Sequence, residues 1–479
     1  MLMFVPKSMY IFLYLRAIIG KVIDLNKTTT MVNDLTQGSI MSRLLKFSAP
    51  FILANCLQLL YNLIDMIIVG QFVGSAGLSA VSIGGELLHF VTFIGMGFSQ
   101  AGQIIIAQYV GKGDRKSISR VVGTLLSFTT LLAIVIMFIG LFACEGIIRL
   151  MNTPDEAYDQ ALSYSRICCC GAVFIYGYNS VSNIMRGMGD SKRPLMFIGI
   201  AAFINLVLDL LFVAVFKMNA AGAALATVIG QAVSFIISII YLYRRREAFG
   251  FDFKPQSFKI DVHLLGTLTK LGIPVTLQTI AISVSMMYVS ACINSYGLVY
   301  SAVTGISSKI AQIANIVTTS MNSAGATMVG QNFGAGNYHR VSKVIWYVFL
   351  ISISFSTIVT LLLLAFPEQA FRLFNDDPEV ILVAMEVVPV IIINFFSAAT
   401  RVPACALVNG IGFASMNFVM GIMDGVVVRI GLALIMGKIL NMGVYGYWYG
   451  SAIAGFVYFI VIMPYFLSGA WKKRKPVID

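Results

Sequence analysis

The sequence predicts an all-α integral membrane protein with twelve transmembrane helices, arranged as two six-helix bundles that a pseudo-two-fold axis along the membrane normal relates. Three observations predict this fold: apolar runs long enough to cross a bilayer, basic residues in alternate breaks between these runs, and an internal repeat of half the chain. The 479 residues are 58% hydrophobic and only 11% charged, with a mean hydropathy of +0.87. Soluble domains carry roughly 25% charged residues, so this composition excludes a soluble protein.

Apolar runs of about 20 residues, each able to cross roughly 30 Å of hydrocarbon, recur along nearly the whole chain. Turn residues separate them, for example Gly111 to Asp114 and Pro367. The expected spans are 44–70, 86–110, 120–144, 162–185, 194–217, 221–243, 271–294, 303–330, 341–366, 379–401, 413–438 and 443–468.

Basic residues follow the even-numbered spans. Examples are Lys112 and Arg115 after the second span, Arg244 to Arg246 after the sixth, and Lys472 to Lys475 after the twelfth. The positive-inside rule then places both termini in the cytoplasm and predicts a multi-pass protein of the plasma membrane. The net charge is +12, and its Lys and Arg residues lie between the apolar runs, where they orient the spans in the membrane. We therefore expect no nucleic-acid partner.

The charge and span patterns divide the chain into five parts. They are an N-terminal extension at 1–35, a first six-helix bundle at 36–243, a cytoplasmic linker at 244–270, a second six-helix bundle at 271–468 and a basic cytoplasmic tail at 469–479. Met31 precedes a more ordinary polar start, so translation is expected to begin there rather than at Met1. The seven cysteines lie mostly inside apolar runs, which argues against a disulfide framework.

The chain contains a tandem repeat. SQAGQIIIAQYVGKGDRKSISRVV at 99–122 aligns with NSAGATMVGQNFGAGNYHRVSKVI at 322–345, an interval of 223 residues. The same interval pairs RLMNTPDE with RLFNDDPE, and pairs Gly187 with Gly410. Six spans separate equivalent residues, so both halves enter the membrane in the same direction. Two such halves can rock against each other, which is the geometry of alternating access.

Two carboxylates in the first half have no counterpart in the second. Asp65 in span 1 aligns with Val289, and Asp209 in span 5 aligns with Leu432. Asn205 lies four residues before Asp209, so the two share a helix face. Two carboxylates in a low dielectric cannot both stay charged without a cation, so such a site takes a proton or Na⁺. A charge at membrane depth is a functional hypothesis by default.

Other charges are less distinctive. Glu86 and Lys309 lie one repeat interval apart, and we expect them to face the central cleft and to pair in one conformation. Asp424 and Arg429 in span 11 are five residues apart and either satisfy each other or line the cleft. Arg401 is expected near the cytoplasmic edge.

Several fragments together resemble the multidrug and toxic compound extrusion (MATE) family from about residue 34 to residue 475. They are PFILANCLQLLYNLIDMIIVGQFVG in the first span, AQYVGKGD after the second, RGMGDSKRP after the fourth and INLVLDLLF in the fifth. The resemblance implies a V-shaped antiporter that exports amphipathic, often cationic, compounds in exchange for Na⁺ or H⁺. It implies a cation site in the first bundle made of Asp65, Asn205, Asp209 and Thr227, with Asn179 in the same network and Tyr61 and Tyr164 beside it.

The sequence departs from the family pattern in one respect. Some branches carry a Glu in span 7 and an Asp in span 10. Span 7 here has no acid, and span 10 has none after Glu386. The resemblance therefore implies that coupling runs through the first bundle. Neutralising Asp65 and Asp209 would let span 1 repack and release the drug outward.

Alternatives with other cargo or chemistry remain open at this point. A flippase for lipid-linked saccharide precursors shares the fold, but it would need several cations for pyrophosphate, and only Lys309, Arg401 and Arg429 are candidates. An enzyme is not expected, because no H-E-x-x-H or suitably placed G-x-S-x-G occurs and the chain has three His. A channel fits repeats with buried carboxylates less well than a carrier. The expected partners are amphipathic drugs and membrane lipid, the expected state is a monomer, and no cofactor is expected besides the transported ion.

Overall fold

The computed structural model describes residues 32–151 and 153–478, which form helices joined by short turns, with no β-strand among them. The expectation for residues 1–30 lies outside this part of the chain. The helices of the first half are α2 (Ile40–Phe72), α3 (Ser75–Lys112), α4 (Arg115–Leu150), α5 (Asp155–Cys170), α6 (Ala172–Gly187), α7 (Lys192–Asp209), the π-helix η1 (Leu210–Val215) and α8 (Asn219–Arg244).

The second half repeats this order after a linker that holds α9 (Arg246–Phe249) and the 3₁₀ turn η2 (Pro255–Phe258). Its helices are α10 (Val262–Asn294), α11 (Leu298–Gly334), α12 (Tyr338–Ala365), α13 (Pro367–Arg372), α14 (Pro378–Gly410), α15 (Ala414–Ile422), η3 (Met423–Val428), α16 (Arg429–Leu434), η4 (Ile435–Ile439), α17 (Gly443–Ala454), α18 (Val457–Leu467) and η5 (Ala470–Lys473).

Ten of the described helices, with continuous pieces joined, are long and apolar enough to cross a membrane. The bent pair α5–α6, with 49° between its parts, makes an eleventh. Helix α11 has 37 residues but is rich in Ser, Thr, Asn and Gly, and it does not meet the same apolarity criterion. The all-α membrane fold is therefore confirmed, while the count of twelve depends on α11 and stays a prediction.

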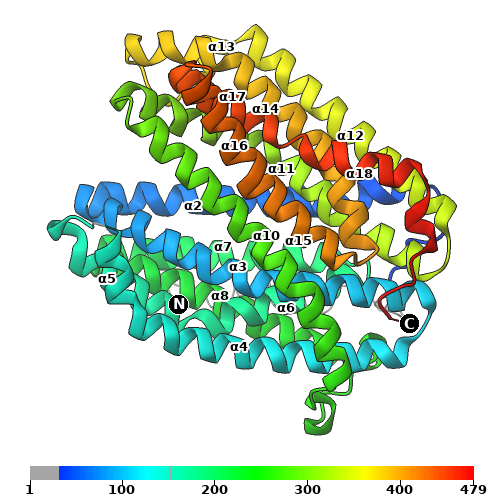
Figure 1. Cartoon of the computed structure of the whole chain (residues 1–479). Helices are drawn as coiled ribbons and strands as arrows, with labels where there is room; N and C mark the ends of the chain where they lie inside the picture. Colours follow the sequence, from blue (N-terminus) through cyan, green and yellow to red (C-terminus); the bar gives the residue numbers. More distant parts are fainter. Residues whose placement is uncertain (1–31, 152, 479) are drawn as a thin grey trace, which may run out of the picture.

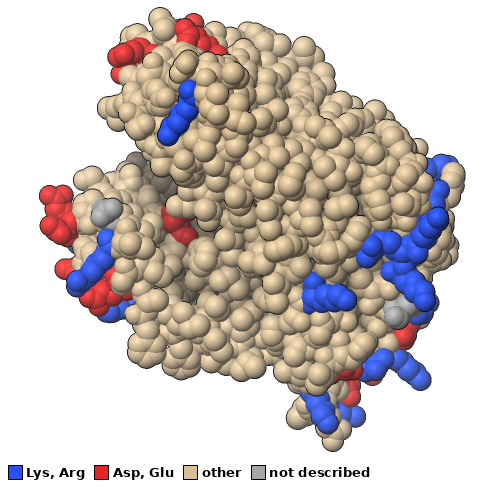
Figure 2. Space-filling model, in the orientation of Figure 1, with Lys and Arg blue, Asp and Glu red and all other residues tan. Residues whose placement is uncertain are grey.

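The two halves lie one above the other in Figure 1 and meet along α3 and α11. Figure 2 shows a wedge-shaped hollow between them on the left, where α2 and α10 end. Lys and Arg dominate the opposite end, on the right, which we call the basic end. The molecule is thus a V that is closed at its basic end.

The first helix of each half begins inside the other half. Ile40, Leu44 and Phe47 of α2 are buried in a core cluster built from α11, α12, α14 and α18. Their repeat mates Leu264, Leu268 and Leu271 of α10 are buried in the main cluster of the first half. The expected boundaries place α2 in the first bundle and divide α10 between the linker at 244–270 and the second bundle at 271–468, so they do not anticipate this exchange.

Equivalent glycines lie in the turn between α3 and α4 and in the turn between α11 and α12. Gly113 has φ +77° and Gly336 has φ +71°, a left-handed conformation that glycine adopts without strain. The next residues, Asp114 and Asn337, cap the following helices, accepting hydrogen bonds from Ser117 N (3.1 Å) and Arg340 N (3.4 Å). The hydrogen bonds from the Ser117 hydroxyl and the Ser117 N–H hold the pKa of Asp114 below its ordinary value. The repeated motif G-x-G-D/N therefore encodes the same turn in both halves.

Helix α10 begins at Val262, nine residues before the expected start of the seventh span. Asp261 caps it and accepts hydrogen bonds from His263 N (3.0 Å) and Leu264 N (3.2 Å). The linker is accordingly shorter than predicted. It also packs on α4, where the Ser127 hydroxyl donates to the Phe258 carbonyl at 2.6 Å.

Candidate functional site

Asp65 and Asp209 lie next to each other inside the first half, and we call them the carboxylate pair. Asp65 is on α2, seven residues before its end and therefore about 10 Å from the wide end of the wedge. Asp209 is the last residue of α7, where the chain passes into the π-helix η1. Their exposed fractions are only 7% and 1%. π-Helical turns often occur at functional sites.

Three carboxylate oxygens of the pair have no hydrogen-bond partner among the described residues: Asp65 Oδ1 and both oxygens of Asp209. Buried polar atoms are nearly always hydrogen-bonded, so these oxygens are suited to accept a proton or to bind a cation. Two adjacent carboxylates cannot both stay ionised in a low dielectric without a cation. The geometry therefore suits reversible binding of one small cation.

The two predicted tyrosines border the carboxylate pair. Tyr61 is half-buried one turn before Asp65 on α2, and Tyr164 of α5 is 4% exposed. Both lie close to Asp65. Tyrosine side chains beside the pair provide no positive counter-charge.

The amide and hydroxyl groups predicted for the site are only partly brought together. Asn205 is 4% exposed, and its Nδ2 donates to Thr227 Oγ1 of α8 at 3.3 Å. This bond leaves the Asn205 Oδ1 available one helical turn from Asp209. Asn179 instead donates to its own helix, from Nδ2 to the Ile175 carbonyl at 2.9 Å.

The donor types at the site are carboxylate, amide and hydroxyl oxygens, which are hard ligands. The described residues contain no group of three His, Cys, Asp or Glu side chains able to hold a metal ion. A cation at the carboxylate pair would therefore use neutral oxygens besides the two acids.

Glu86 and Lys309 are both exposed, on α3 and α11 respectively. No ion pair or hydrogen bond joins these two described residues in this conformation. Their pairing in another conformation stays a prediction.

Asp424, Arg429 and Arg401 form one ion-pair group in the second half, which we call the arginine–aspartate cluster. Arg429 Nη2 lies 2.8 Å from Asp424 Oδ1, and Arg401 Nη1 lies 3.5 Å from Asp424 Oδ2. Asp424 is fully buried, and the expectation that Arg401 lies near the cytoplasmic edge stays a prediction. Lys309 is not part of the cluster, so the three cations considered for pyrophosphate do not gather at one place.

Two glutamines that the repeat aligned, but to which no role was assigned, join the halves at the basic end. Gln108 Nε2 donates to the Gly410 carbonyl at 3.0 Å, and Gln331 Nε2 donates to the Gly187 carbonyl at 3.2 Å. Each side-chain oxygen also accepts from a segment near one end of the chain: Leu35 N with Gln331 and Val477 N with Gln108, both at 2.9 Å. The only sign of this contact in the sequence is that the repeat aligns the two glutamines with each other and the two glycines with each other.

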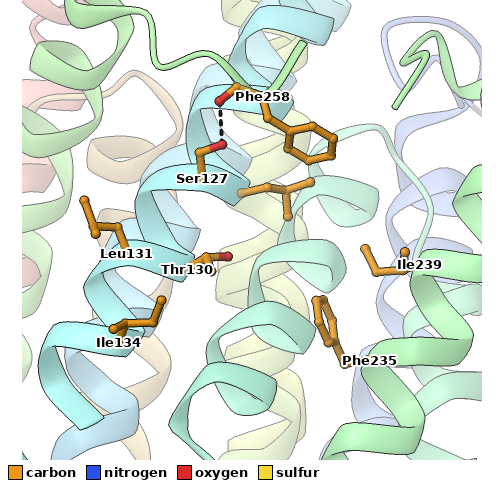
Figure 3. A pocket seen from close by; sticks show the side chains of 8 residues that line it. Ser127, Thr130, Leu131, Ile134, Phe235, Ile239 and Phe258 are labelled. Atoms are coloured by element: carbon orange, nitrogen blue, oxygen red, sulfur yellow. Dashed lines mark hydrogen bonds between the residues drawn. The ribbon is translucent and has the colours of Figure 1, made fainter. Parts of the chain in front are cut away.

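An apolar cavity of about 350 Å³ lies between α4 and α8, beneath the linker (Figure 3). It is lined by Leu126, Ser127, Thr130, Leu131, Ile134, Phe235, Ile239 and Phe258. Leu131 and Ile134 are exposed, so the cavity opens on the outer surface of the helices. It contains no charged side chain and is separate from the carboxylate pair.

Comparisons with known proteins agree with this architecture. A family model described as MatE matches the chain twice, at residues 50–211 and 274–435. The probable multidrug resistance protein YpnP of Bacillus subtilis (strain 168) is 31% identical over 348 residues, covering 73% of this chain and 77% of the relative. The probable multidrug resistance protein YoeA of the same organism is 27% identical over 445 residues, covering 92% and 96%.

Solved structures show the same fold. One described as the outward-facing conformation of a multidrug resistance MATE family transporter of the MOP superfamily has a TM-score of 0.86 and 23% identity, covering 94% of this chain and 100% of that chain. A MATE structure in the straight conformation has a TM-score of 0.86 at 22% identity, with the same coverage. The paired family matches start 224 residues apart, as the repeat requires, and together with the similarity to YpnP they show that the chain belongs to the MatE family.

Proposed function

We propose that this protein is a secondary active exporter of amphipathic, often cationic, small molecules, driven by Na⁺ or H⁺ that binds at the carboxylate pair. Its relatives are named multidrug resistance and multidrug export proteins. The observation that carries the proposal is the carboxylate pair itself: two buried acids with three unpartnered oxygens, near the wide end of an open wedge.

The arrangement couples ion and drug if each prefers a different conformation. Asp65 lies on α2, whose first turns are buried in the other half. Neutralising the pair removes a charge conflict along this helix and allows α2 to repack. We infer that cation entry favours drug release to the outside, and that cation release to the inside resets the cycle.

The distribution of charge supports an orientation. By the positive-inside rule the basic end faces the cytoplasm, so both termini are cytoplasmic and the wedge opens outward. We further propose location in the plasma membrane, action as a monomer and no requirement for a cofactor.

Ethidium efflux from cells or inverted vesicles tests the proposal, with wild type compared with Asp65→Asn. Efflux should need Asp65 and should stop when the driving ion gradient is removed, by omission of Na⁺ or by a protonophore. Asp376→Asn is the matched control, because Asp376 is 85% exposed. Normal efflux by Asp65→Asn would refute coupling at this site.

A further inference from the structure

The arginine–aspartate cluster lies deep in the second half. Asp424 occupies η3 and is fully buried, and Arg429 is 3% exposed. Arg429 Nη1 also donates to the Ser451 carbonyl at 2.9 Å and to the Ser451 hydroxyl at 3.1 Å. Arg401 lies nine residues before the end of α14, which places it about 14 Å from the basic end of that helix.

The cluster has an uncompensated positive charge. It holds two guanidinium groups but one carboxylate, and no other acid forms an ion pair with either arginine among the described residues. An unpaired charge at membrane depth is expensive, so such a site normally has a counter-ion.

Atoms of the cluster are left without hydrogen bonds. Arg429 Nε has no hydrogen-bond partner among the described residues, and Asp424 Oδ2 has only its ion pair with Arg401. The Arg401 side chain is 30% exposed, although its partner Asp424 is not accessible at all. A membrane-embedded arginine faces protein or water rather than lipid, so the exposed part of the Arg401 side chain is the part of the cluster that a ligand can reach.

An aromatic ring packs against the Arg401 guanidinium. The Arg401 guanidinium lies 5.1 Å from the centre of the Tyr458 ring, whose hydroxyl accepts a hydrogen bond from Gln278 of α10. Tyr458 is fully buried, so its ring holds the guanidinium in place from the protein side and leaves the exposed part of Arg401 to face a ligand.

The repeat shows that the cluster is not part of the common framework. Arg401, Asp424 and Arg429 align with Tyr178, Ala201 and Leu206 of the first half, at the interval of 223. The carboxylate pair has no counterpart in the second half either. One half therefore holds an acidic site and the other a basic site, at different depths along the molecule.

We propose that the arginine–aspartate cluster is an anion site that binds the carboxylate of a zwitterionic amphipathic ligand through Arg401. The proposal rests on the export function above and names a ligand group for it. A single exposed guanidinium with one excess charge matches a monoanion, and the hydrogen bonds it would donate to a carboxylate are charge-assisted. A pyrophosphate would require more cations than the cluster provides.

Two rhodamines provide a matched pair of probes. Rhodamine 110 has a free carboxylate, and rhodamine 123 is its methyl ester, so the two differ only at the group in question. Binding of each to the purified full-length protein, measured by fluorescence anisotropy, gives a ratio of dissociation constants. Arg401→Gln should weaken rhodamine 110 binding about tenfold and leave rhodamine 123 binding within about twofold. Retained rhodamine 123 binding also shows that the variant is folded.

Controls separate the outcomes. Arg149→Gln removes an exposed arginine paired with Glu145 and should leave the ratio unchanged. Arg401→Lys should retain part of the preference, because it keeps the charge but not the two-pronged geometry. An unchanged ratio in Arg401→Gln overturns the proposal.

The same probes distinguish this proposal from the export function. Ion-driven transport of rhodamine 123 with no carboxylate preference would leave the export function standing and refute the anion site. If neither dye is bound or transported, both proposals fail for this ligand class.

Discussion

Gln108 and Gln331 are mates in the internal repeat, and each donates its side-chain amide to a glycine carbonyl of the opposite half, at 3.0 Å and 3.2 Å. The acceptors, Gly410 and Gly187, are repeat mates as well. The same glutamine–glycine hydrogen bond therefore occurs twice, once from each half, and closes the basic end of the wedge. Each glutamine also binds a segment near one end of the chain.

Gln331→Leu should weaken this closure. The substitution leaves the Gly187 carbonyl and Leu35 N without a partner, which costs about 1–3 kcal/mol. The state open at the basic end should become roughly 5- to 150-fold more populated. Spin labels at the exposed positions Lys116 and Lys343 would report it as a longer distance. Gln369→Leu, on an exposed position of α13, is the control, and identical distance distributions would contradict the prediction.

Gly111→Ala should push α3 and α11 apart, because the added methyl group would overlap with backbone atoms. A Cβ at Gly111 would lie 1.8 Å from the Gln331 carbonyl oxygen, and one at Gly334 would lie 2.1 Å from that of Gln108. Backbone atoms cannot yield cheaply, so we expect a loss of stability of about 1–3 kcal/mol in this conformation. Thermal unfolding in detergent measures it. Gly146→Ala meets nothing within 4 Å and should be neutral or stabilising. Equal melting temperatures for the two variants would argue against the close crossing.

Thr227→Val should weaken ion binding while leaving export possible. Valine has nearly the same shape as threonine but lacks the hydroxyl that accepts from Asn205 Nδ2 at 3.3 Å. The loss of one hydrogen bond, about 1 kcal/mol, predicts a rise of roughly fivefold in the half-saturating Na⁺ or H⁺ concentration. Efflux rates at varied ion concentration measure it. Thr357→Val is the control, because Thr357 is exposed and bonds only its own helix. An unchanged ion dependence would remove Thr227 from the site.

Asp424→Asn should destabilise the second half strongly. It leaves two guanidinium groups in the membrane without their carboxylate, a loss of about 3–5 kcal/mol. The triple variant Arg401→Met, Asp424→Leu and Arg429→Met removes all the charges and should recover most of that stability. Unfolding midpoints in detergent decide the matter. If the triple variant were less stable than Asp424→Asn, the ion pairs themselves would hold this half together.

Hydropathy and the repeat predicted most of the fold. A helix that crosses lipid must be long and apolar whatever it packs against, so its sequence alone reveals it. The helix ends were less predictable. Caps such as Asp261 extend helices beyond the apolar run, where hydropathy gives no signal. Helix α11 has a low hydropathy because it packs against α3 and α14 rather than against lipid.

The carboxylate pair could be found because an acid inside an apolar run is conspicuous, and because Asp65 and Asp209 lack repeat mates. The position of Asn179 was not predictable from a pattern, since an amide can bond its own helix as readily as a ligand. The pairing of Arg401 with Asp424 links helices that are distant in sequence. Nothing in either helix alone indicates the other.

The exchange of first helices has a consequence for how such a chain arose and how it unfolds. Leu44 of α2 completes the core of the second half, and its mate Leu268 of α10 completes that of the first. This is the topology of a domain-swapped homodimer whose two subunits have been fused into one gene. Neither half expressed alone would have a complete core. The molecule should therefore melt in one cooperative transition, and two separately expressed halves should accumulate only when they are produced together.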